Sequence, residues 1–219
     1  MIKYPCLILD HDDTVVQSEA TVNYPYFCDI LDKFRPGAKI TEQEYTEGCY
    51  YMGFVEMCRV KYNFTDDELS EEYRGWKKYI RNHIPEAYDG IRKLIHRQKA
   101  AGGLVCVVSH STEENIRRDY RVHIGLQPDE IYGWDHPEHQ RKPNPYPLEQ
   151  IIKKYRLNPG DLLVVDDMKP AWEMARAVGC PIAFAGWGRK NYPQISEEMT
   201  SICDFSFDSV DKLTDFLFK

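Results

Sequence analysis

The 219-residue sequence lacks the features of several protein classes. Its seven cysteines are odd in number, scattered and without a C-x-x-C pair, which argues against a disulfide framework or a zinc ribbon. The first sixteen residues do not have the basic-then-apolar layout of a secretory signal. No aliphatic run approaches the roughly 18 residues needed to span a bilayer. We therefore expect a cytoplasmic protein with reduced thiols and no membrane segment.

A basic region is also missing. The formal net charge is −7 at pH 7, and residues 16–85 carry a net −3 while the rest of the chain carries −4. We therefore expect no nucleic-acid partner and no binding to an anionic membrane. The composition, 42% apolar and 29% charged, is that of a globular protein. At roughly 150 residues per domain, the length fits one large domain or one domain with an insertion.

Short continuous apolar runs predict strands that are buried on both faces, as in parallel sheets. Three strong runs and a weaker fourth occupy residues 4–9, 104–108, 162–165 and 182–185. Apolar residues recur at helical spacing around residues 88–101, 144–155 and 210–217, and Pro170 and Gly179 mark the start and end of another helix. This alternation of strands and helices predicts an α/β fold with a doubly wound, Rossmann-like parallel sheet.

Two helix starts are predicted from their capping residues. Ser111 and Glu114 have the spacing of a capping box, which predicts a helix directly after the second strand. Asn144 and Pro145 are the N-cap and first helical residue that we expect for a later helix.

Residues 16–85 interrupt the alternation, because they contain no run that would form a buried strand. Capping boxes beginning at Thr41 and Thr65 predict helices there, and we expect a bundle of about four, with the many aromatic residues mostly in its core. The predicted domains are therefore a Rossmann-like core of residues 1–15 and 86–219 and an inserted helical domain of residues 16–85.

Polar residues follow each of the three strong runs. Residues 10–14 come after the first, Ser109 and His110 after the second, and Asp166 and Asp167 after the third. The carboxyl ends of strands in an open α/β sheet share one crevice, where ligands bind. We therefore expect these side chains to converge, together with Lys142 from a loop shortly before the third strand.

Several carboxylates in one pocket raise one another's pKa unless a cation neutralises them. Mg²⁺ prefers one or two carboxylates together with water and phosphate oxygens. Asp10 and Asp167 fit that preference, and Lys142 would offset further negative charge. The sequence thus predicts a Mg²⁺ site at this edge of the sheet.

Such a site suits phosphoryl transfer, which depends mainly on positioning and charge neutralisation. The Asp10 carboxylate can act as a nucleophile and form an aspartyl-phosphate. Ser109 would donate to a phosphoryl oxygen, helped by the N-terminus of the helix that follows. Asp12, expected on the same strand face as Asp10, would protonate the leaving alkoxide and then deprotonate the attacking water.

The motifs and their order resemble those of the haloacid dehalogenase-like hydrolase superfamily. They are Asp10-x-Asp12-x-Thr14, Ser109, Lys142-Pro143-x-Pro145 and Asp166-Asp167. The resemblance covers essentially the whole chain, and the helical insertion is similar to the cap of the subfamily that includes phosphoglycolate phosphatase and β-phosphoglucomutase. It implies a Mg²⁺-dependent phosphohydrolase that cleaves a small phosphorylated metabolite through an aspartyl-phosphate, beneath a cap that sets specificity. We expect a monomer or a small homo-oligomer.

The resemblance also implies a role for each motif residue. Asp10 would be the nucleophile and Asp12 the acid and base. The Asp10 carboxylate, the Asp12 main-chain carbonyl and Asp167 would hold Mg²⁺, with Asp166 reaching it directly or through water. The substrate would be bound by Thr14, Ser109, His110 and Lys142.

Two positions depart from the family pattern. Asp13 stands where the family usually has glycine, and we expect the turn to survive because aspartate tolerates unusual backbone angles better than most residues. His110 stands where asparagine is common, and it could donate to the phosphate or to another part of the substrate.

Alternative activities are separated by the motifs to different degrees. Dehalogenases and phosphonoacetaldehyde hydrolases of the superfamily lack an aspartate at the position of Asp12, so phosphate-ester chemistry is favoured. A phosphosugar mutase would keep the same core residues and remains an alternative. A phospho-acceptor signalling domain is disfavoured, because its acidic pair would come first and it would lack the insertion. The substrate is not predicted by the sequence.

Overall fold

The structure is a computed structural model that describes residues 2–218. Its contacts divide the chain into two compact units, Met1–Gln17 with Glu86–Lys219, and Ser18–Pro85. Val16 and Gln17 belong to the first unit, since Val16 forms a β-bridge to Ala87 and the Gln17 amide donates to the Glu86 carbonyl at 2.8 Å. Within residues 2–218, no helix combines the length and apolar character that crossing a bilayer requires.

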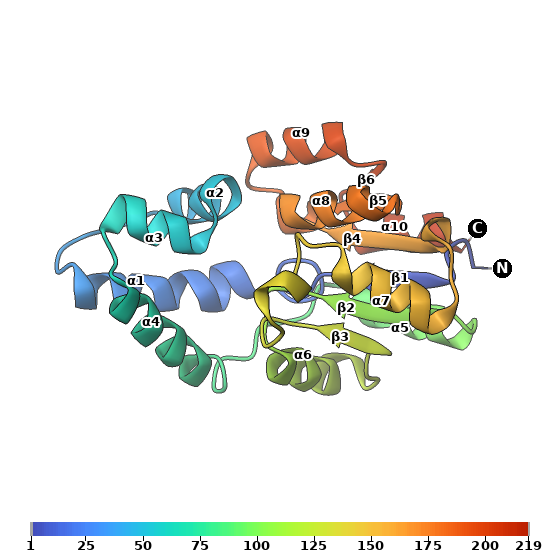
Figure 1. The fold of residues 1–219 in the computed structure, drawn as a ribbon, viewed down its shortest axis with the longest axis horizontal. Helices are drawn as coiled ribbons and strands as arrows, with labels where there is room; N and C mark the ends of the chain where they lie inside the picture. Colours follow the sequence, from blue (N-terminus) through green and yellow to red (C-terminus); the bar gives the residue numbers. More distant parts are fainter. Residues whose placement is uncertain (1, 219) are drawn as a thin grey trace. The chain divides into compact units, whose positions relative to one another are not determined.

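The first unit, which we call the α/β unit, is built on a parallel sheet of six strands (Figure 1). The strands are β1 (Cys6–Leu9), β2 (Leu104–Val108), β3 (Glu130–Tyr132), β4 (Leu162–Asp166), β5 (Ile182–Ala185) and β6 (Phe205–Phe207). Their order is β3-β2-β1-β4-β5-β6, so the direction of winding reverses between β1 and β4. The predicted doubly wound, Rossmann-like α/β fold is confirmed.

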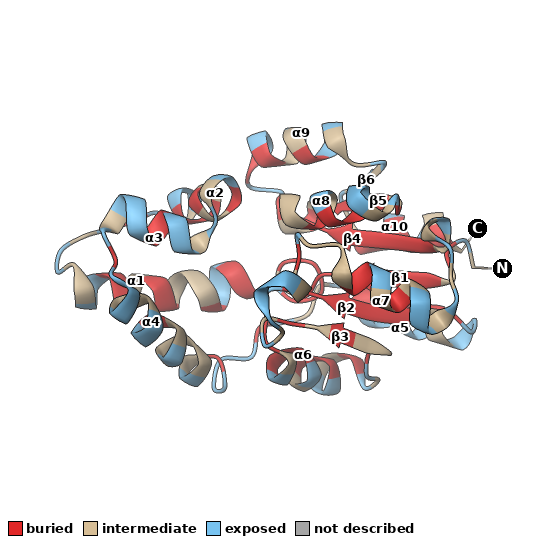
Figure 2. Cartoon of the chain, in the orientation of Figure 1, coloured by how far each residue is buried: buried red, intermediate tan, exposed pale blue. Residues whose placement is uncertain are grey.

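Two hydrophobic clusters cover the two faces of the sheet, because successive strand residues point to opposite sides. Leu7 and the strand residues on the same face of the sheet pack against α5 (Ile91–Ala100), α6 (Glu113–Asp119), the π-helical turn Tyr120–Ile124 and α10 (Val210–Leu217). Ile8 and the strand residues on the opposite face pack against α7 (Tyr146–Tyr155) and α8 (Lys169–Val178). Figure 2 shows the central strands as buried. Burial on both faces explains why these strands read as unbroken apolar runs.

Three elements of the α/β unit were not predicted. The strands β3 and β6 have only three residues each and lie at the two edges of the sheet, so neither forms an apolar run. The helix α9 (Pro193–Ile202) begins at a proline and buries Ile195 and Met199, a spacing that could have predicted it. Short 3₁₀ turns complete the unit at Glu138–Gln140, Pro159–Asp161 and Gly186–Gly188.

Both predicted helix starts in this unit are shifted. The N-cap of α6 is Thr112, whose side chain accepts from the Asn115 amide, so the predicted box of Ser111 and Glu114 is wrong. Residue Pro145 is the N-cap of α7, and the proline of the first turn is Pro147, so the prediction of Asn144 as N-cap is also wrong. Thr112 supplies the hydroxyl cap that was expected from Ser111, whereas the N-cap of α7 makes no side-chain cap hydrogen bond.

The second unit, which we call the helical unit, contains α1 (Tyr24–Phe34), α2 (Glu42–Met52), α3 (Phe54–Tyr62) and α4 (Asp66–Tyr79), preceded by a π-helical turn at Glu19–Asn23. Capping boxes at Thr41 and Thr65 begin α2 and α4, as predicted. Aromatic side chains dominate its core, with Phe27 in ring contact with Tyr45, Phe54, Tyr62 and Phe64. The assignment of this unit as a cap stays a prediction.

Candidate active site

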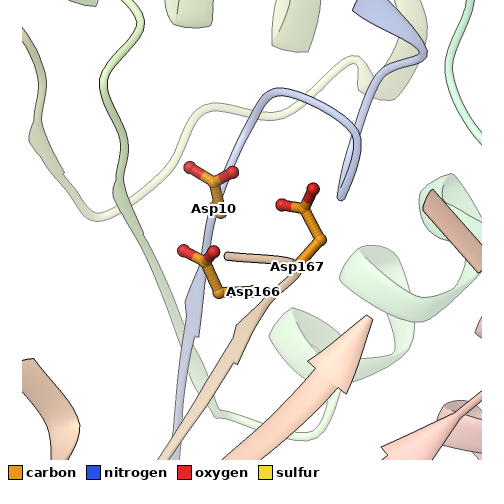
Figure 3. A group of neighbouring side chains, drawn as sticks. All are labelled: Asp10, Asp166 and Asp167. Carbon is orange, nitrogen blue, oxygen red and sulfur yellow. The ribbon is translucent and has the colours of Figure 1, made fainter. Parts of the chain in front are cut away.

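The predicted acidic residues meet where the winding of the sheet reverses. Asp10 directly follows β1, Asp166 is the last residue of the neighbouring strand β4, and Asp167 comes next. All three residues are buried, with exposed fractions of 5%, 1% and 0%. One carboxylate oxygen from each lies within 4.8 Å of the others, and Figure 3 shows the three side chains together. Ligands of doubly wound folds bind at this crevice.

Lys142 neutralises two members of the cluster. Its Nζ lies 2.7 Å from Asp10 Oδ1 and 2.8 Å from Asp166 Oδ2, and the side chain is buried. Burial alone would lower the pKa of Lys142, but the two carboxylates raise it above its ordinary value, so the ammonium stays charged. Burial raises the pKa of Asp166, and the adjacent Asp10 and Asp167 raise it further against the effect of Lys142.

Asp167 is held by a different set of residues. The Arg189 Nη2 lies 2.6 Å from Asp167 Oδ2, and the Thr14 hydroxyl donates to Asp167 Oδ1 at 3.4 Å. Thr14 is fully buried, and its carbonyl accepts from Trp187 Nε1 at 3.0 Å. The predicted substrate ligand Thr14 thus contacts the cluster itself.

The donor set fits a hard divalent cation. Three buried carboxylates supply closely spaced oxygen atoms, which are the ligands that Mg²⁺ prefers, and two cationic side chains leave part of their negative charge uncompensated. Such a group of like charges is costly to bury without a counter-charge.

The loop after β1 is held by main-chain hydrogen bonds. The amide of Asp13 donates to the Val16 carbonyl at 2.7 Å, and both Val15 and Val16 donate back to His11. Asp12 forms an isolated β-bridge with Val16 and is partly exposed, and its expected position on the same face as Asp10 stays a prediction. Asp13 adopts a φ of 53°, which confirms that aspartate is accommodated in the turn where glycine was expected.

The two polar residues after β2 occupy different environments. Ser109 is buried, and its hydroxyl oxygen accepts from the Ser111 amide at 3.1 Å. His110 is exposed, and its Nε2–H donates to the Lys142 carbonyl at 2.9 Å. His110 therefore joins the β2 loop to the Lys142 loop.

Two buried contacts of this region were missed at the level of sequence. Arg189 follows the fourth apolar run, so its position at the same sheet edge was a usable signal. His11 lies between Asp10 and Asp12, and its Nε2 is 3.0 Å from Asp119 Oδ2. Burial alone would raise the pKa of Asp119, but hydrogen bonds from His11 and Arg118 hold it below its ordinary value.

Comparison with known families identifies this arrangement. The model of the haloacid dehalogenase-like hydrolases matches residues 7–185, which include all four motifs. The chain belongs to that family. The resemblance predicted from the motifs is confirmed, and the protein is a hydrolase of this fold. Arg189 lies outside the matched residues.

Solved structures of haloacid dehalogenase-like proteins share the fold. One, described as a predicted phosphoglycolate phosphatase from Haemophilus somnus, is 19% identical with a TM-score of 0.77, covering 99% of both chains. CbbY from Rhodobacter sphaeroides in complex with phosphate is 17% identical with a TM-score of 0.73, covering 97% of this chain and 96% of that one. A hydrolase from Deinococcus radiodurans with bound phosphate and sodium is 15% identical with a TM-score of 0.73, covering 100% and 99%. No curated protein sequence matches.

Proposed function

We propose that this hydrolase is a Mg²⁺-dependent phosphomonoesterase that acts on a small phosphorylated metabolite through an aspartyl-phosphate on Asp10. The observation that carries the proposal is the buried group of Asp10, Asp166 and Asp167, with Lys142 bonded to two of them. Phosphate bound in the CbbY and Deinococcus radiodurans structures of similar fold supports a phosphate group as ligand.

The cation would be held by the carboxylates of Asp10 and Asp167 and the main-chain carbonyl of Asp12, with Asp166 as a further acidic neighbour. When bound, Mg²⁺ supplies positive charge that neutralises phosphoryl oxygens next to the carboxylates. The chain contributes Lys142, whose permanent charge lies within hydrogen-bond distance of the proposed nucleophile.

The proposed reaction has two displacements on phosphorus. A carboxylate oxygen of Asp10 attacks, and the ester oxygen leaves with a proton supplied by Asp12. Asp12 then takes a proton from a water that attacks the same phosphorus, the bond to Asp10 breaks, and inorganic phosphate leaves. The partial exposure of Asp12 supports this exchange of protons with substrate and water.

The remaining predicted residues are assigned by their contacts. Ser109 is proposed to donate to the phosphoryl group, and His110 to fix the Lys142 loop while remaining exposed to substrate. Thr14 is proposed to orient Asp167. The helical unit Ser18–Pro85 is proposed as the cap that sets substrate choice, and its insertion directly after the Asp10 loop supports this.

Replacement of the nucleophile tests the proposal. Asp10→Asn should lower kcat/KM for p-nitrophenyl phosphate in MgCl₂ by at least about 10³-fold, because no other carboxylate takes over the attack. Asp208→Asn, which changes an exposed aspartate paired with Lys212, is the matched control and should keep full activity. EDTA should abolish wild-type turnover and MgCl₂ should restore it.

Two results would contradict the proposal. Turnover by Asp10→Asn near the wild-type value would remove Asp10 as the nucleophile. In a panel of phosphorylated metabolites, formation of an isomeric phosphosugar without release of phosphate would replace the hydrolase with a mutase.

A further inference from the structure

Arg189 is a buried cation that the four motifs do not include. It follows the 3₁₀ turn Gly186–Gly188 at the end of β5, and only 3% of the residue is exposed. Its Nη2 lies 2.6 Å from Asp167 Oδ2. Arginine keeps its proton at any pH that a protein survives, so this is a permanent charge inside the site.

The backbone around Arg189 is fixed on both sides. Its amide donates to the Gly186 carbonyl at 3.2 Å. Its carbonyl accepts from the Tyr192 amide at 3.0 Å and from the Ser196 hydroxyl at 2.8 Å. The side chain is therefore aimed at Asp167 by an anchored segment of chain.

The same turn packs directly on the loop that carries Asp10. Trp187 donates to the Thr14 carbonyl, and a Cβ added at Gly188 would lie 2.0 Å from the Asp13 carbonyl oxygen. Glycine is required at position 188 because any side chain would push the two segments apart. Each of the three consecutive residues 187–189 thus contacts either the loop that carries Asp10 or the side chain of Asp167.

The two cations divide the acidic cluster between them. Lys142 binds Asp10 and Asp166, and among residues 2–218 it forms no ion pair with Asp167. Arg189 supplies positive charge to Asp167. A buried carboxylate without a counter-charge would take up a proton or move into water.

We propose that Arg189 is a positioning residue that acts as a built-in counter-ion for Asp167. It holds the carboxylate in place before a divalent cation binds, and afterwards it would share Asp167 with that cation. The inference rests on the Mg²⁺ site of the proposed function. It predicts that the empty site is stable because of Arg189 and that Mg²⁺ binds less tightly than three unshared carboxylates would allow.

Thermal unfolding with and without the cation tests this role. Arg189→Gln should lower the Tm in EDTA by on the order of 10 °C, because it removes the cation that pairs with the buried Asp167. Addition of MgCl₂ should raise the Tm more in Arg189→Gln than in wild type, since the ion then replaces the missing charge. Arg189→Lys keeps the charge and should show a rise close to that of wild type.

A matched control separates this role from ordinary packing. Arg176→Gln removes a half-exposed arginine that pairs with Asp204 at 3.2 Å, and its response to MgCl₂ should equal that of wild type. If MgCl₂ raises the Tm of Arg189→Gln by no more than it raises that of wild type, the proposed role of Arg189 is overturned and the Mg²⁺ site is not. No rise in wild type would overturn the Mg²⁺ site of the proposed function, and this inference with it.

A double variant keeps the test decisive if Arg189→Gln does not fold. In Asp167→Asn with Arg189→Gln, neither partner is charged, so its Tm in EDTA should exceed that of Asp167→Asn alone. A Tm below that of Asp167→Asn would show that Arg189 does not serve as the counter-ion of Asp167.

Discussion

The two units of the molecule treat buried charge differently. In the α/β unit, buried ionisable groups from distant segments lie beside groups of opposite charge, as Asp10 does with Lys142 and Asp167 with Arg189. In the helical unit, Glu72 on α4 is only 7% exposed and has no ion pair among residues 2–218. Burial raises the pKa of Glu72 to about 7.

The difference is between buried carboxylates that have a cationic partner and a buried carboxyl that has none. At the candidate site, cations from other loops lie beside the buried carboxylates and offset part of the cost of burying them. Glu72 has no such partner, so it becomes partly neutral instead. Paired buried charge therefore marks the candidate site, and the single buried carboxyl of Glu72 lies outside it.

The largest expected effect comes from removing one cation of the site. Lys142→Met leaves Asp10 and Asp166 without their shared partner, so we expect a loss of about 3–5 kcal/mol in the free energy of unfolding. We also expect a fall of about 10²–10³-fold in kcat, because the charge next to the proposed nucleophile is lost. Urea unfolding and p-nitrophenyl phosphate kinetics measure the two effects.

An exposed lysine provides the comparison for Lys142. Lys154, which pairs with Glu130 at the surface, should change the unfolding free energy by less than about 0.5 kcal/mol when replaced by methionine. If Lys142→Met cost no more than Lys154→Met, the cations of the α/β unit would not be holding its buried acids.

A smaller effect of opposite sign is expected for Glu72. A carboxyl whose folded pKa lies near 7 and whose unfolded pKa lies near 4.5 binds more protons when folded, so stability falls as pH rises from about 4.5 to 7 and is then level. The lost stability above that window is about 3 kcal/mol. Glu72→Gln should therefore stabilise the helical unit at pH 8 and should change its stability little at pH 4.5.

The neighbouring residue controls for Glu72. Glu71, on the same helix, is exposed and pairs with Lys33, so Glu71→Gln should leave the pH dependence of urea unfolding unchanged. The stability of the wild type should fall between pH 5 and 7. If it does not, or if Glu72→Gln shows the same fall, burial of the Glu72 carboxyl does not cause the loss of stability.

The smallest effect concerns packing without charge. A Cβ at Gly75 would lie 2.2 Å from the Tyr26 hydroxyl, which donates to the Glu72 carbonyl at 2.8 Å. Gly75→Ala should cost about 1–3 kcal/mol by overpacking, equally at pH 5 and 8. In a Tyr26→Phe background, which removes the clashing oxygen, the same change should cost clearly less. An undiminished cost there would mean that the helix itself, not Tyr26, rejects the alanine.

The sequence predicts those parts of the fold whose burial is complete. Strands β1, β2, β4 and β5 are covered on both faces and appear as apolar runs, while the three-residue edge strands β3 and β6 leave no such pattern. Capping boxes in the helical unit are read correctly because their side chains make the predicted local bonds.

The candidate site is predictable only where a motif marks it. Asp10, Lys142, Asp166 and Asp167 are found from strand ends and their order, and the structure brings them together. The turn that follows Asp12 is closed by a main-chain hydrogen bond from Asp13 to Val16, which no side-chain pattern shows. The contact of Arg189 depends on the close approach of Gly188 to Asp13, which only three-dimensional packing determines.

The central position of β1 also governs the order in which the protein can form during synthesis. Cys6 pairs with Leu104 on one side and with Leu162 on the other, so β1 waits for partners made 98 and 156 residues later. Residues 18–85 have most of their contacts within their own segment and can fold in the meantime. The candidate site therefore gains its last buried cation only when residue 189 arrives beside Asp167.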